Sequence, residues 1–497
     1  MALITQAQYL DSMKKLKPKV YIGGKWVKNL LDNPVTKSMV MANAAMYWLA
    51  EQPEHKEVMV AKSHLTGEPI NRNLNVARNI HDLDMRQEMA LLTSQTVGTC
   101  NYRCVGCDAL NSVAATTWEM DRDLGTKYNE RFNKWLAYAQ KNDLAVSGAI
   151  TDAKGDRKKR PSQQDDLDVY LHLVEKRDDG IVVRGYKVSQ SGAIGSHETL
   201  VLPGGALREG EEKFALAFAV QNSVPGLSYI CQYNAYSAER EMFVDDPDEL
   251  GNPIYGQRET STMIFDNVFI PWERVFLFGE TKYAGRMVTR FAKAHRMNCG
   301  GACKVGFADV IIGGTLMAAE AIGVEKVPHI QEKIVDMVRY SETSHACAIA
   351  AAMRGREEPK GSGVYLPDDL FGNAAKLNIA HGFWEILKNA GDIGGGLVVT
   401  MPRLKDLKDP EVGPVLKKVF GAAAPAETRL KIAKFLQHWT SGLHGAGTWH
   451  GAGAPQTQRF MFTVLTDFEK KKKLARKLMG MKEEDAPVKA EPKKAAK

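Results

Sequence analysis

The stretch VYLHLVEKRDDGIVVRGYKV, residues 169–188, decides the fold class of this chain. It places Asp179-Gly180 between two apolar, partly alternating runs, and an Asp-Gly pair in that position favours a tight β-hairpin. Further strand-like runs are ETLVLPGG (198–205), LSYICQY (227–233) and STMIFDNVFIP (261–271). The sequence therefore predicts a β region at roughly residues 148–275.

Helical patterns flank this β region on both sides. Apolar side chains recur at three- and four-residue spacing in residues 41–59 and 126–143 before it, and in residues 305–327 and 328–355 after it. The order helical, β, helical differs from the strand–helix alternation of a parallel α/β sheet. We therefore predict an α+β chain of three domains. They are an N-terminal helical domain at 1–147, a middle β domain, barrel or sheet, at 148–275, and a C-terminal helical bundle at 276–479.

The positive charge of the chain is concentrated at its C-terminus. Residues 470–497 hold 11 Lys/Arg and 4 Asp/Glu, a balance equal to the +7 of all 497 residues, so the body is formally neutral. A nucleic-acid-binding face is therefore not indicated. Residues 480–497, rich in Pro, Lys and Ala, are expected to form a disordered basic tail because they cannot supply a core.

The sequence shows neither a membrane-spanning run nor a secretory signal. No apolar run approaches the roughly 18 residues that a spanning helix needs. The first 20 residues lack a basic segment followed by an apolar block. We therefore expect a cytoplasmic protein without a membrane segment.

Seven cysteines, an odd number, favour reduced thiols over a disulfide framework. Three lie in TCNYRCVGCD, residues 99–108, and two lie with His295 in AHRMNCGGACK, residues 294–304. If both segments are helical, Cys100 and Cys104 share one face, and so do His295 and Cys303 unless Gly300-Gly301 breaks the helix. Such a set suits four ligands of a metal cluster, although buried thiols and a hydrogen-bonded core histidine would look the same.

The spacing C-x3-C-x2-C also matches radical S-adenosylmethionine enzymes, in which three cysteines hold a four-iron cluster. Those enzymes are built on partial α/β barrels, and the required strand–helix alternation is missing around residues 99–108. Spacing alone still leaves Cys107 as a possible ligand.

Longer segments give the chain a more specific resemblance. They are QYLDSMKKLKPKVYIGG, CNYRCVGCDALN, SGAITDAKGDRKKRPS, EKRDDGIVVRG, SGAIGSHE, FDNVFIPWERVF, AHRMNCGGACKVG, GGGLVVTMP and HGAGAPQTQRF. In these segments the chain resembles the 4-hydroxybutyryl-CoA dehydratases, within the 4-hydroxyphenylacetate 3-hydroxylase family of the acyl-CoA dehydrogenase-like superfamily. The resemblance extends to about residue 478. It implies an acyl-CoA dehydrogenase-like fold, a homotetramer, FAD and a [4Fe-4S] cluster.

The resemblance also implies the residues that bind these cofactors. The implied cluster ligands are Cys100, Cys104, His295 and Cys303, with Cys107 as a packed thiol. One more residue separates His295 from Cys303 than in the family pattern, a change that two neighbouring glycines tolerate. The implied flavin-binding residues are Ile150, Thr151, Lys154, Ser191, Gly451, Ala452 and Gly453.

The activity implied by the resemblance is radical dehydration of 4-hydroxybutyryl-CoA, or of a related hydroxyacyl-CoA, to an enoyl-CoA. Vinylacetyl-CoA Δ-isomerisation is implied as a second activity, and the expected partner is an acyl-CoA thioester. The β-hydrogen that leaves is not acidic, so ordinary acid–base catalysis needs the help of the flavin and of the iron bound by His295.

The proton-transfer residues of the family are only partly kept. The family tyrosine four residues after the ligand histidine is Cys299 here, and its two glutamates align with Thr260 and Gly447. We therefore consider six residues as catalytic candidates, namely His295, Lys304, Glu259, Tyr102, Cys299 and His450. The alternative function is a flavin monooxygenase or an acyl-CoA oxidoreductase on the same fold, which leaves the cysteines unexplained.

Overall fold

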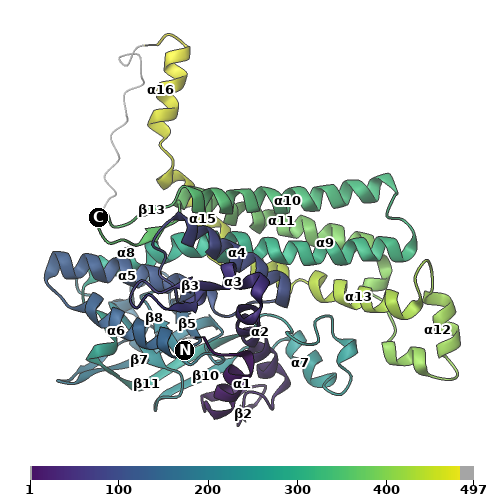
Figure 1. The fold of residues 1–497 in the computed structure, drawn as a ribbon, viewed down its shortest axis with the longest axis horizontal. Coiled ribbons are helices and arrows are strands. Elements are labelled where there is room, and N and C mark those ends of the chain that lie inside the picture. The colour runs from purple at the N-terminus through teal and green to yellow at the C-terminus, as the bar shows by residue number, and fades with distance from the viewer. Residues whose placement is uncertain (1–2, 482–497) are drawn as a thin grey trace.

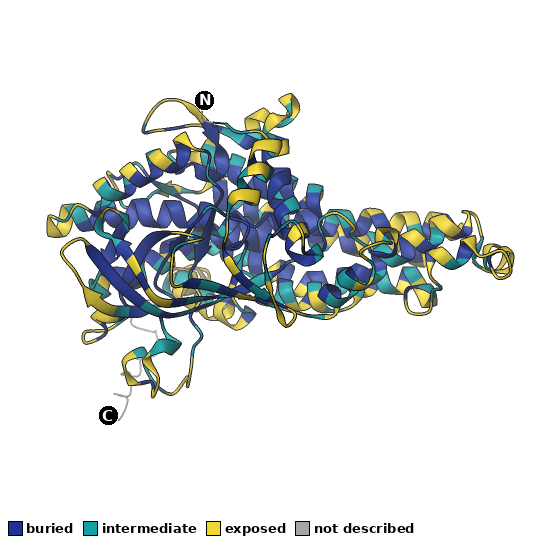
Figure 2. Ribbon diagram, turned by 90° about the horizontal axis from the view of Figure 1, so that it is seen from below, coloured by how far each residue is buried: buried dark blue, intermediate teal, exposed yellow. Residues whose placement is uncertain are grey.

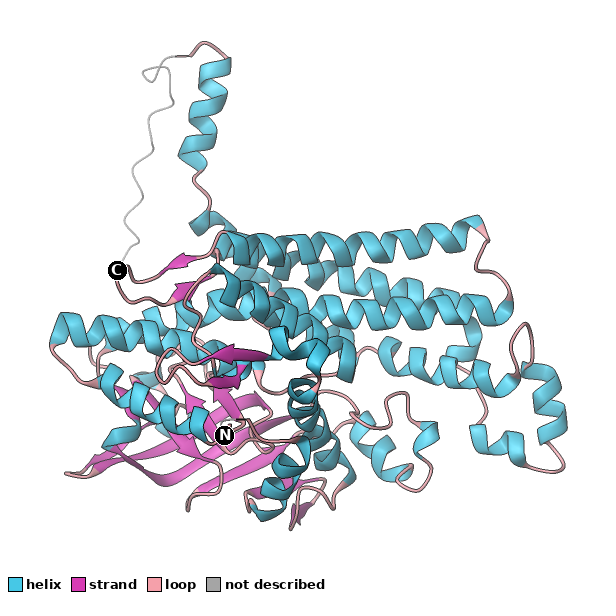
Figure 3. Cartoon of the chain, viewed as in Figure 1, coloured by secondary structure: helices cyan, strands magenta, loops and turns pink. Residues whose placement is uncertain are grey.

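The computed structural model of the chain describes residues 3–481 (Figure 1). Strands gather at one end of the molecule, and long helices extend away from them (Figure 3). The predicted order of helical, β and helical regions is confirmed. Most of the tail expected to be disordered, residues 482–497, lies outside the described residues.

The N-terminal region is mainly helical but also contributes strands, which the sequence analysis did not predict. Val20–Ile22 pairs with the hairpin strand beside it, and the residues from Lys19 to Tyr21 pair in parallel with residues 228–230. The elements are α1 (Gln6–Lys15), β1 (Lys19–Ile22), β2 (Lys25–Val27), α2 (Pro34–Glu51), α3 (Lys56–Met59), β3 (Val60–Lys62), β4 (Pro69–Asn71), α4 (Ile80–Val97), α5 (Cys104–Leu124) and α6 (Tyr128–Lys141).

The middle region forms two open sheets rather than a barrel. Its elements are β5 (Val146–Ala149), β6 (His172–Lys176), β7 (Gly180–Ser191), β8 (Glu198–Val201), β9 (Leu216–Gln221), β10 (Leu227–Cys231), α7 (Ala235–Met242), β11 (Thr260–Pro271) and β12 (Val275–Phe278). The strand orders are β2-β1-β10-β11-β7-β6 and β12-β9-β8-β5. The barrel alternative is wrong because the outermost strands of these sheets do not pair with each other. The Asp179-Gly180 hairpin is confirmed, since β6 and β7 pair antiparallel on either side of it.

The C-terminal region is a helical bundle that projects from the β end (Figure 1). Its elements are α8 (Thr281–His295), the π-helical segment η8 (Arg296–Ala302), α9 (Cys303–Ile322), α10 (Pro328–Met353), β13 (Arg356–Glu357), β14 (Tyr365–Leu366), α11 (Asp369–Gly394), α12 (Gly413–Phe420), α13 (Ala426–Thr440), α14 (Leu443–His450), α15 (Pro455–Leu465) and α16 (Phe468–Leu478).

Helices α8, η8 and α9 form one continuous helix, Thr281–Ile322. By length and composition it is the one membrane-span candidate in residues 3–481, and 50% of its apolar window is buried inside the protein. A core helix passes the same test, so the candidate is weak evidence for a membrane span.

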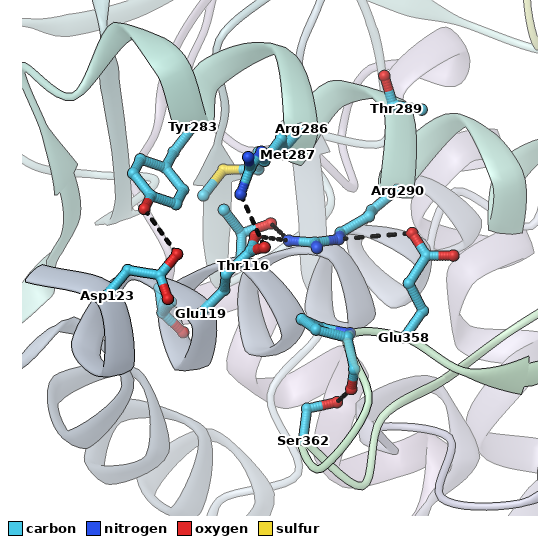
Figure 4. Close-up of polar contacts among 12 residues, drawn as sticks. Thr116, Glu119, Asp123, Tyr283, Arg286, Met287, Thr289, Arg290, Glu358 and Ser362 are labelled. Atoms are coloured by element: carbon cyan, nitrogen blue, oxygen red, sulfur yellow. Dashed lines mark hydrogen bonds and ion pairs between the residues drawn. The ribbon is translucent and has the colours of Figure 1, made fainter.

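An antiparallel ladder of polar contacts fastens α8 to α5 (Figure 4). Near the start of α8, Tyr283 donates to Asp123 at 3.1 Å. One to two turns further along, Glu119 accepts from Arg286 at 2.7 Å and pairs with Arg290 at 2.9 Å. Because each step along α8 moves back along α5, this register brings the end of α8 to the beginning of α5, where the cysteines lie.

Buried residues occur both in the sheets and in the helical bundle (Figure 2). One hydrophobic cluster joins Tyr9 and Val40 of the N-terminal helices to Phe265 and Met263 of β11. The predicted domain boundaries near residues 147 and 275 stay a prediction, because the N-terminal and middle regions share both this core and a sheet.

Candidate metal centre

Cys100 lies in the loop between α4 and α5, not on a helix. Gly98 ends α4 in the left-handed conformation, with φ 57°. Asn101 then accepts from the backbone N–H groups of Arg103 and Cys104 and so caps the start of α5. The predicted single helical face for Cys100 and Cys104 is therefore wrong, although the short loop still brings the two thiols together.

The second group of ligand candidates lies along an unbroken helix. His295 ends α8, Cys299 lies within η8 and Cys303 begins α9. Gly300-Gly301 does not break this helix; the seven residues of η8 adopt the wider π form instead. A π-helical turn accommodates an extra residue without ending a helix, which accounts physically for the additional residue between His295 and Cys303.

Five donors converge where these segments meet. The donor atoms of Cys104, His295 and Cys299 all lie within 4.8 Å of one another and are buried. The Cys104 thiol contacts those of Cys100 and Cys299, and Cys303 contacts Cys299. All five are soft or borderline ligands, so this donor set fits an iron–sulfur cluster. Every cysteine in the chain is free of disulfide bonding.

Buried cations balance the charge of these thiols. Lys304 Nζ lies 3.6 Å from Cys303 Sγ and 4.0 Å from Cys299 Sγ. Burial lowers the pKa of Lys304, but the two thiolates outweigh this effect and raise it to about 12. Hydrogen bonding from Cys104 and Cys303 holds the pKa of Cys299 well below its usual range. The same contacts raise the pKa values of Cys104 and Cys303 above their usual range, so the negative charge of this group is concentrated on Cys299, as a thiolate, the form that binds metals.

Cys107 has a different environment from the other thiols of its motif. Its Sγ lies 2.6 Å from Arg86 Nη2 and 3.9 Å from the carbonyl oxygen of Arg72. Burial raises the pKa of the Cys107 thiol. This environment agrees with a packed thiol that does not bind the metal.

The first group of residues expected to bind flavin, Ile150, Thr151, Lys154 and Ser191, lies in and beside β7. The backbone oxygen of Thr151 accepts from Val188 N, which fixes this loop against β7. Ser191 is the last residue of β7, and Gly192 follows it. A Cβ on Gly192 would lie 2.4 Å from the carbonyl oxygen of Tyr102. This contact places the end of β7 beside the Cys100–Cys104 loop.

The residues just before the glycine-rich segment at 451–453 contact α11. Lys376 of α11 donates to the carbonyl oxygens of Thr448 at 2.6 Å and Trp449 at 3.3 Å. Lys376 also packs against Gly300 of η8, where a Cβ would meet its side chain at 3.0 Å. Ala452 and Gly453 have left-handed φ values of 58° and 98°, which permit a tight turn there.

The proton-transfer candidates do not all reach the cluster. Tyr102 donates its hydroxyl to Gln257 O and accepts from Glu259 N, so its ring is tied to the β region. Glu259 is buried beside this hydroxyl, and burial raises the pKa of its carboxyl to about 7. His450 is exposed at the end of α14, and within residues 3–481 no hydrogen bond joins it to the thiols. Cys299 and Lys304 lie within the cluster itself.

The structure adds four residues that sequence reasoning missed, namely Asp108, Arg258, Lys376 and His444. Arg258 lies against the glycine-rich segment, where a Cβ on Gly447 would be 2.9 Å from its Nη2. His444 is half-buried, with its Nε2 3.0 Å from that of His438. The signal for His444 was present, because residues 444–447 and 450–453 both read HGAG. No sequence pattern marks the other three.

The fold and the site together define a class: helix–sheet–helix proteins whose interior brings thiols and an imidazole together in a set that suits a metal. Two family models match the chain, 4-hydroxyphenylacetate 3-hydroxylase N terminal over residues 5–277 and 4-hydroxyphenylacetate 3-hydroxylase C terminal over residues 284–480. The chain belongs to this family. The radical S-adenosylmethionine alternative is thereby excluded.

Individual relatives share nearly the whole chain. The 4-hydroxybutyryl-CoA dehydratase/vinylacetyl-CoA-Δ-isomerase of Clostridium aminobutyricum is 40% identical over 97% of this chain and 100% of its own. An oxygen-tolerant archaeal 4-hydroxybutyryl-CoA dehydratase from N. maritimus superposes with TM-score 0.93 at 36% identity, covering 99% and 97% of the two chains. The oxygenase component of 4-hydroxyphenylacetate 3-monooxygenase, complexed with FAD, superposes with TM-score 0.83 at 25% identity, covering 96% and 98%.

Proposed function

We propose that this chain is a hydroxyacyl-CoA dehydratase that converts 4-hydroxybutyryl-CoA, or a close analogue, to an enoyl-CoA. Isomerisation of vinylacetyl-CoA is proposed as a second activity of the same site. The carrying observation is the 40% identity with a dehydratase/isomerase over 97% of the chain. The buried group of thiols and one imidazole supports the proposal independently.

The proposal includes FAD and a [4Fe-4S] cluster as cofactors. The residues proposed to hold the cluster are Cys100, Cys104, His295 and Cys303, and those proposed to hold the flavin are Ile150, Thr151, Lys154, Ser191, Gly451, Ala452 and Gly453. When bound, these groups supply one-electron chemistry and a Lewis-acidic iron for the departing hydroxyl.

The chain's own residues handle the protons. Glu259 is proposed to accept a substrate proton, because a carboxyl with a pKa of about 7 is ready to take or release one near neutral pH. Lys304 places a fixed positive charge beside Cys299 and Cys303. Burial and the neighbouring Lys304 lower the pKa of Lys376 to about 7, so it is also able to exchange a proton there.

The other expectations from the sequence belong to the same proposal. They are an acyl-CoA dehydrogenase-like arrangement, a homotetramer, a cytoplasmic location and the absence of nucleic-acid or membrane partners. The monooxygenase alternative has weaker support, because the oxygenase relative is 25% identical and the dehydratase relative is 40% identical.

Anaerobic assays test the proposal directly. The purified protein is expected to turn over 4-hydroxybutyryl-CoA and vinylacetyl-CoA, to contain about four irons per chain and to absorb as a flavin with a broad iron–sulfur shoulder. Cys100→Ala is expected to lose iron and activity together. Flavin absorbance without iron, or full activity in Cys100→Ala, would contradict the proposal.

A further inference from the structure

The carboxylate of Asp108 is buried next to His295, one of the donors that converge with the thiols. Asp108 lies one turn after Cys104 on α5, so the two side chains point to the same side of the helix. Its side chain is only 1% exposed. A buried carboxylate is costly unless donors surround it, and here three donors do.

The three donors come from two different helical segments. His295 Nδ1 lies 2.8 Å from Asp108 Oδ2, and Asn298 Nδ2 donates to Oδ1 at 2.7 Å. Arg86 of α4 reaches the same Oδ1 from the other side at 3.4 Å. The carboxylate is therefore held at both oxygens and cannot rotate freely.

This arrangement fixes the imidazole of His295. Because Asp108 takes Nδ1, Nε2 is the ring nitrogen left for the thiol group, where His295 also contacts Cys299; the partner of one nitrogen decides which nitrogen is available to a metal. The His295 ring also stacks on Phe291, with ring centroids 4.9 Å apart and an angle of 24° between the ring planes. Asp108 and Phe291 thus restrain the ring in two directions.

We propose that Asp108 is a positioning residue that presents Nε2 of His295 to one iron of the cluster. The inference rests on the proposed function, because it requires a cluster at this site. It goes beyond the ligand set, since it assigns to Asp108 the orientation of the one ligand that is not a thiolate. Arg86 and Asn298 hold Asp108 in place for that role.

The test compares iron retention in Asp108→Asn with that in the wild-type holoprotein. Asparagine keeps the shape of the side chain but removes the charge that accepts from Nδ1. Release of iron to a chelator, followed anaerobically by absorbance, is expected to be at least about tenfold faster in Asp108→Asn. Asp121→Asn is the matched control, because Asp121 lies on the same helix and caps the next one through Tyr128 N at 2.8 Å, far along α5 from the thiols. It is expected to release iron at the wild-type rate.

The same substitution in a second variant, His295→Cys, distinguishes a role of Asp108 in orienting His295 from a role in supporting the fold. In His295→Cys the ligand is a thiolate, which needs no hydrogen bond at Nδ1, so adding Asp108→Asn is expected to change iron release by less than about twofold. An equal acceleration in both backgrounds would show that Asp108 only supports the fold and would overturn the inference. Wild-type release in Asp108→Asn would overturn it as well. A wild-type protein without iron would instead contradict the proposed function on which the inference rests.

Discussion

Glu259 carries a pH dependence that links its burial to the proposed chemistry. Its pKa is about 7 in the folded chain against an ordinary 4.5, so the unfolded chain releases this proton first as pH rises. The stability of the fold is therefore expected to fall between about pH 4.5 and 7, by on the order of 3 kcal/mol, and to level off above. Glu259→Gln is expected to flatten this slope in urea unfolding measured between pH 5 and 8.

Activity gives the second measurement on the same variant. If Glu259 accepts the substrate proton, kcat is expected to rise with pH through about 7 in the wild-type enzyme and to fall by about 10²-fold or more in Glu259→Gln. A variant with a flattened stability profile and wild-type kcat would leave Glu259 as a buried structural carboxyl.

Cys299 and Cys303 compete for one ligand position. The resemblance favours Cys303, whereas the closest donor group in the structure contains Cys299. We expect Cys303→Ser to lose most of its iron and Cys299→Ser to keep about four irons per chain. Iron analysis of the two matched variants decides the matter, and the opposite pattern would assign the ligand role to Cys299.

At the scale of the elements, α9 depends on one close helix contact. A Cβ on Gly306 would lie 2.7 Å from the carbonyl oxygen of Leu91 and 2.8 Å from Ser94 Cβ on α4. Because a backbone carbonyl cannot move aside cheaply, Gly306→Ala is expected to lower the free energy of unfolding by about 1–3 kcal/mol.

Gly391→Ala on α11 is the matched control. Its Cβ would meet only Thr440 Cγ2 at 3.8 Å, so a gain of up to about 1 kcal/mol is expected there. Thermal unfolding of both variants checks the pair.

The sequence could predict most helices and strands, because their apolar periodicity is local. It did not predict β1, since this four-residue strand has only a three-residue strand beside it in the sequence, and its other partner, β10, lies more than 200 residues later. Nor did it predict η8, because no local pattern marks a π-helical turn. Gly98 is a sequence signal for the end of α4, because glycine readily takes the left-handed cap conformation that ends a helix. A helix that ends there cannot include Cys100, so the predicted helical position of Cys100 was wrong.

For the site, spacing and resemblance selected the thiols and His295, which the fold does bring together. The residues around them were missed for a physical reason. Asp108 and Lys376 gain their importance from burial and from partners far away in the sequence, such as His295 and Thr448. An aspartate or lysine in a helical pattern otherwise looks like any solvent-facing charge.

At the scale of the whole molecule, the helical bundle leaves apolar side chains uncovered. Met317 of α9 is 52% exposed and Val335 of α10 is 64% exposed. Beside Met317, a hollow of about 410 Å³ is lined by Val310, Ile432 and Phe435. The hollow is also lined by Asp309 and Lys431, and an apolar hollow with polar side chains beside it is typical of an interface.

We therefore predict that this surface of the bundle joins copies of the chain in the expected homotetramer. Light scattering is expected to give the mass of four 54.9 kDa chains for the wild-type protein. Met317→Glu would place a charge in the apolar hollow, and burying an unpaired charge is costly, so this variant is expected to dissociate to smaller species. Val174→Glu is the control, because Val174 is similarly exposed, at 44%, but lies on β6 in the sheet. A tetramer that survives Met317→Glu, or a monomeric wild-type protein, would contradict this role for the bundle surface.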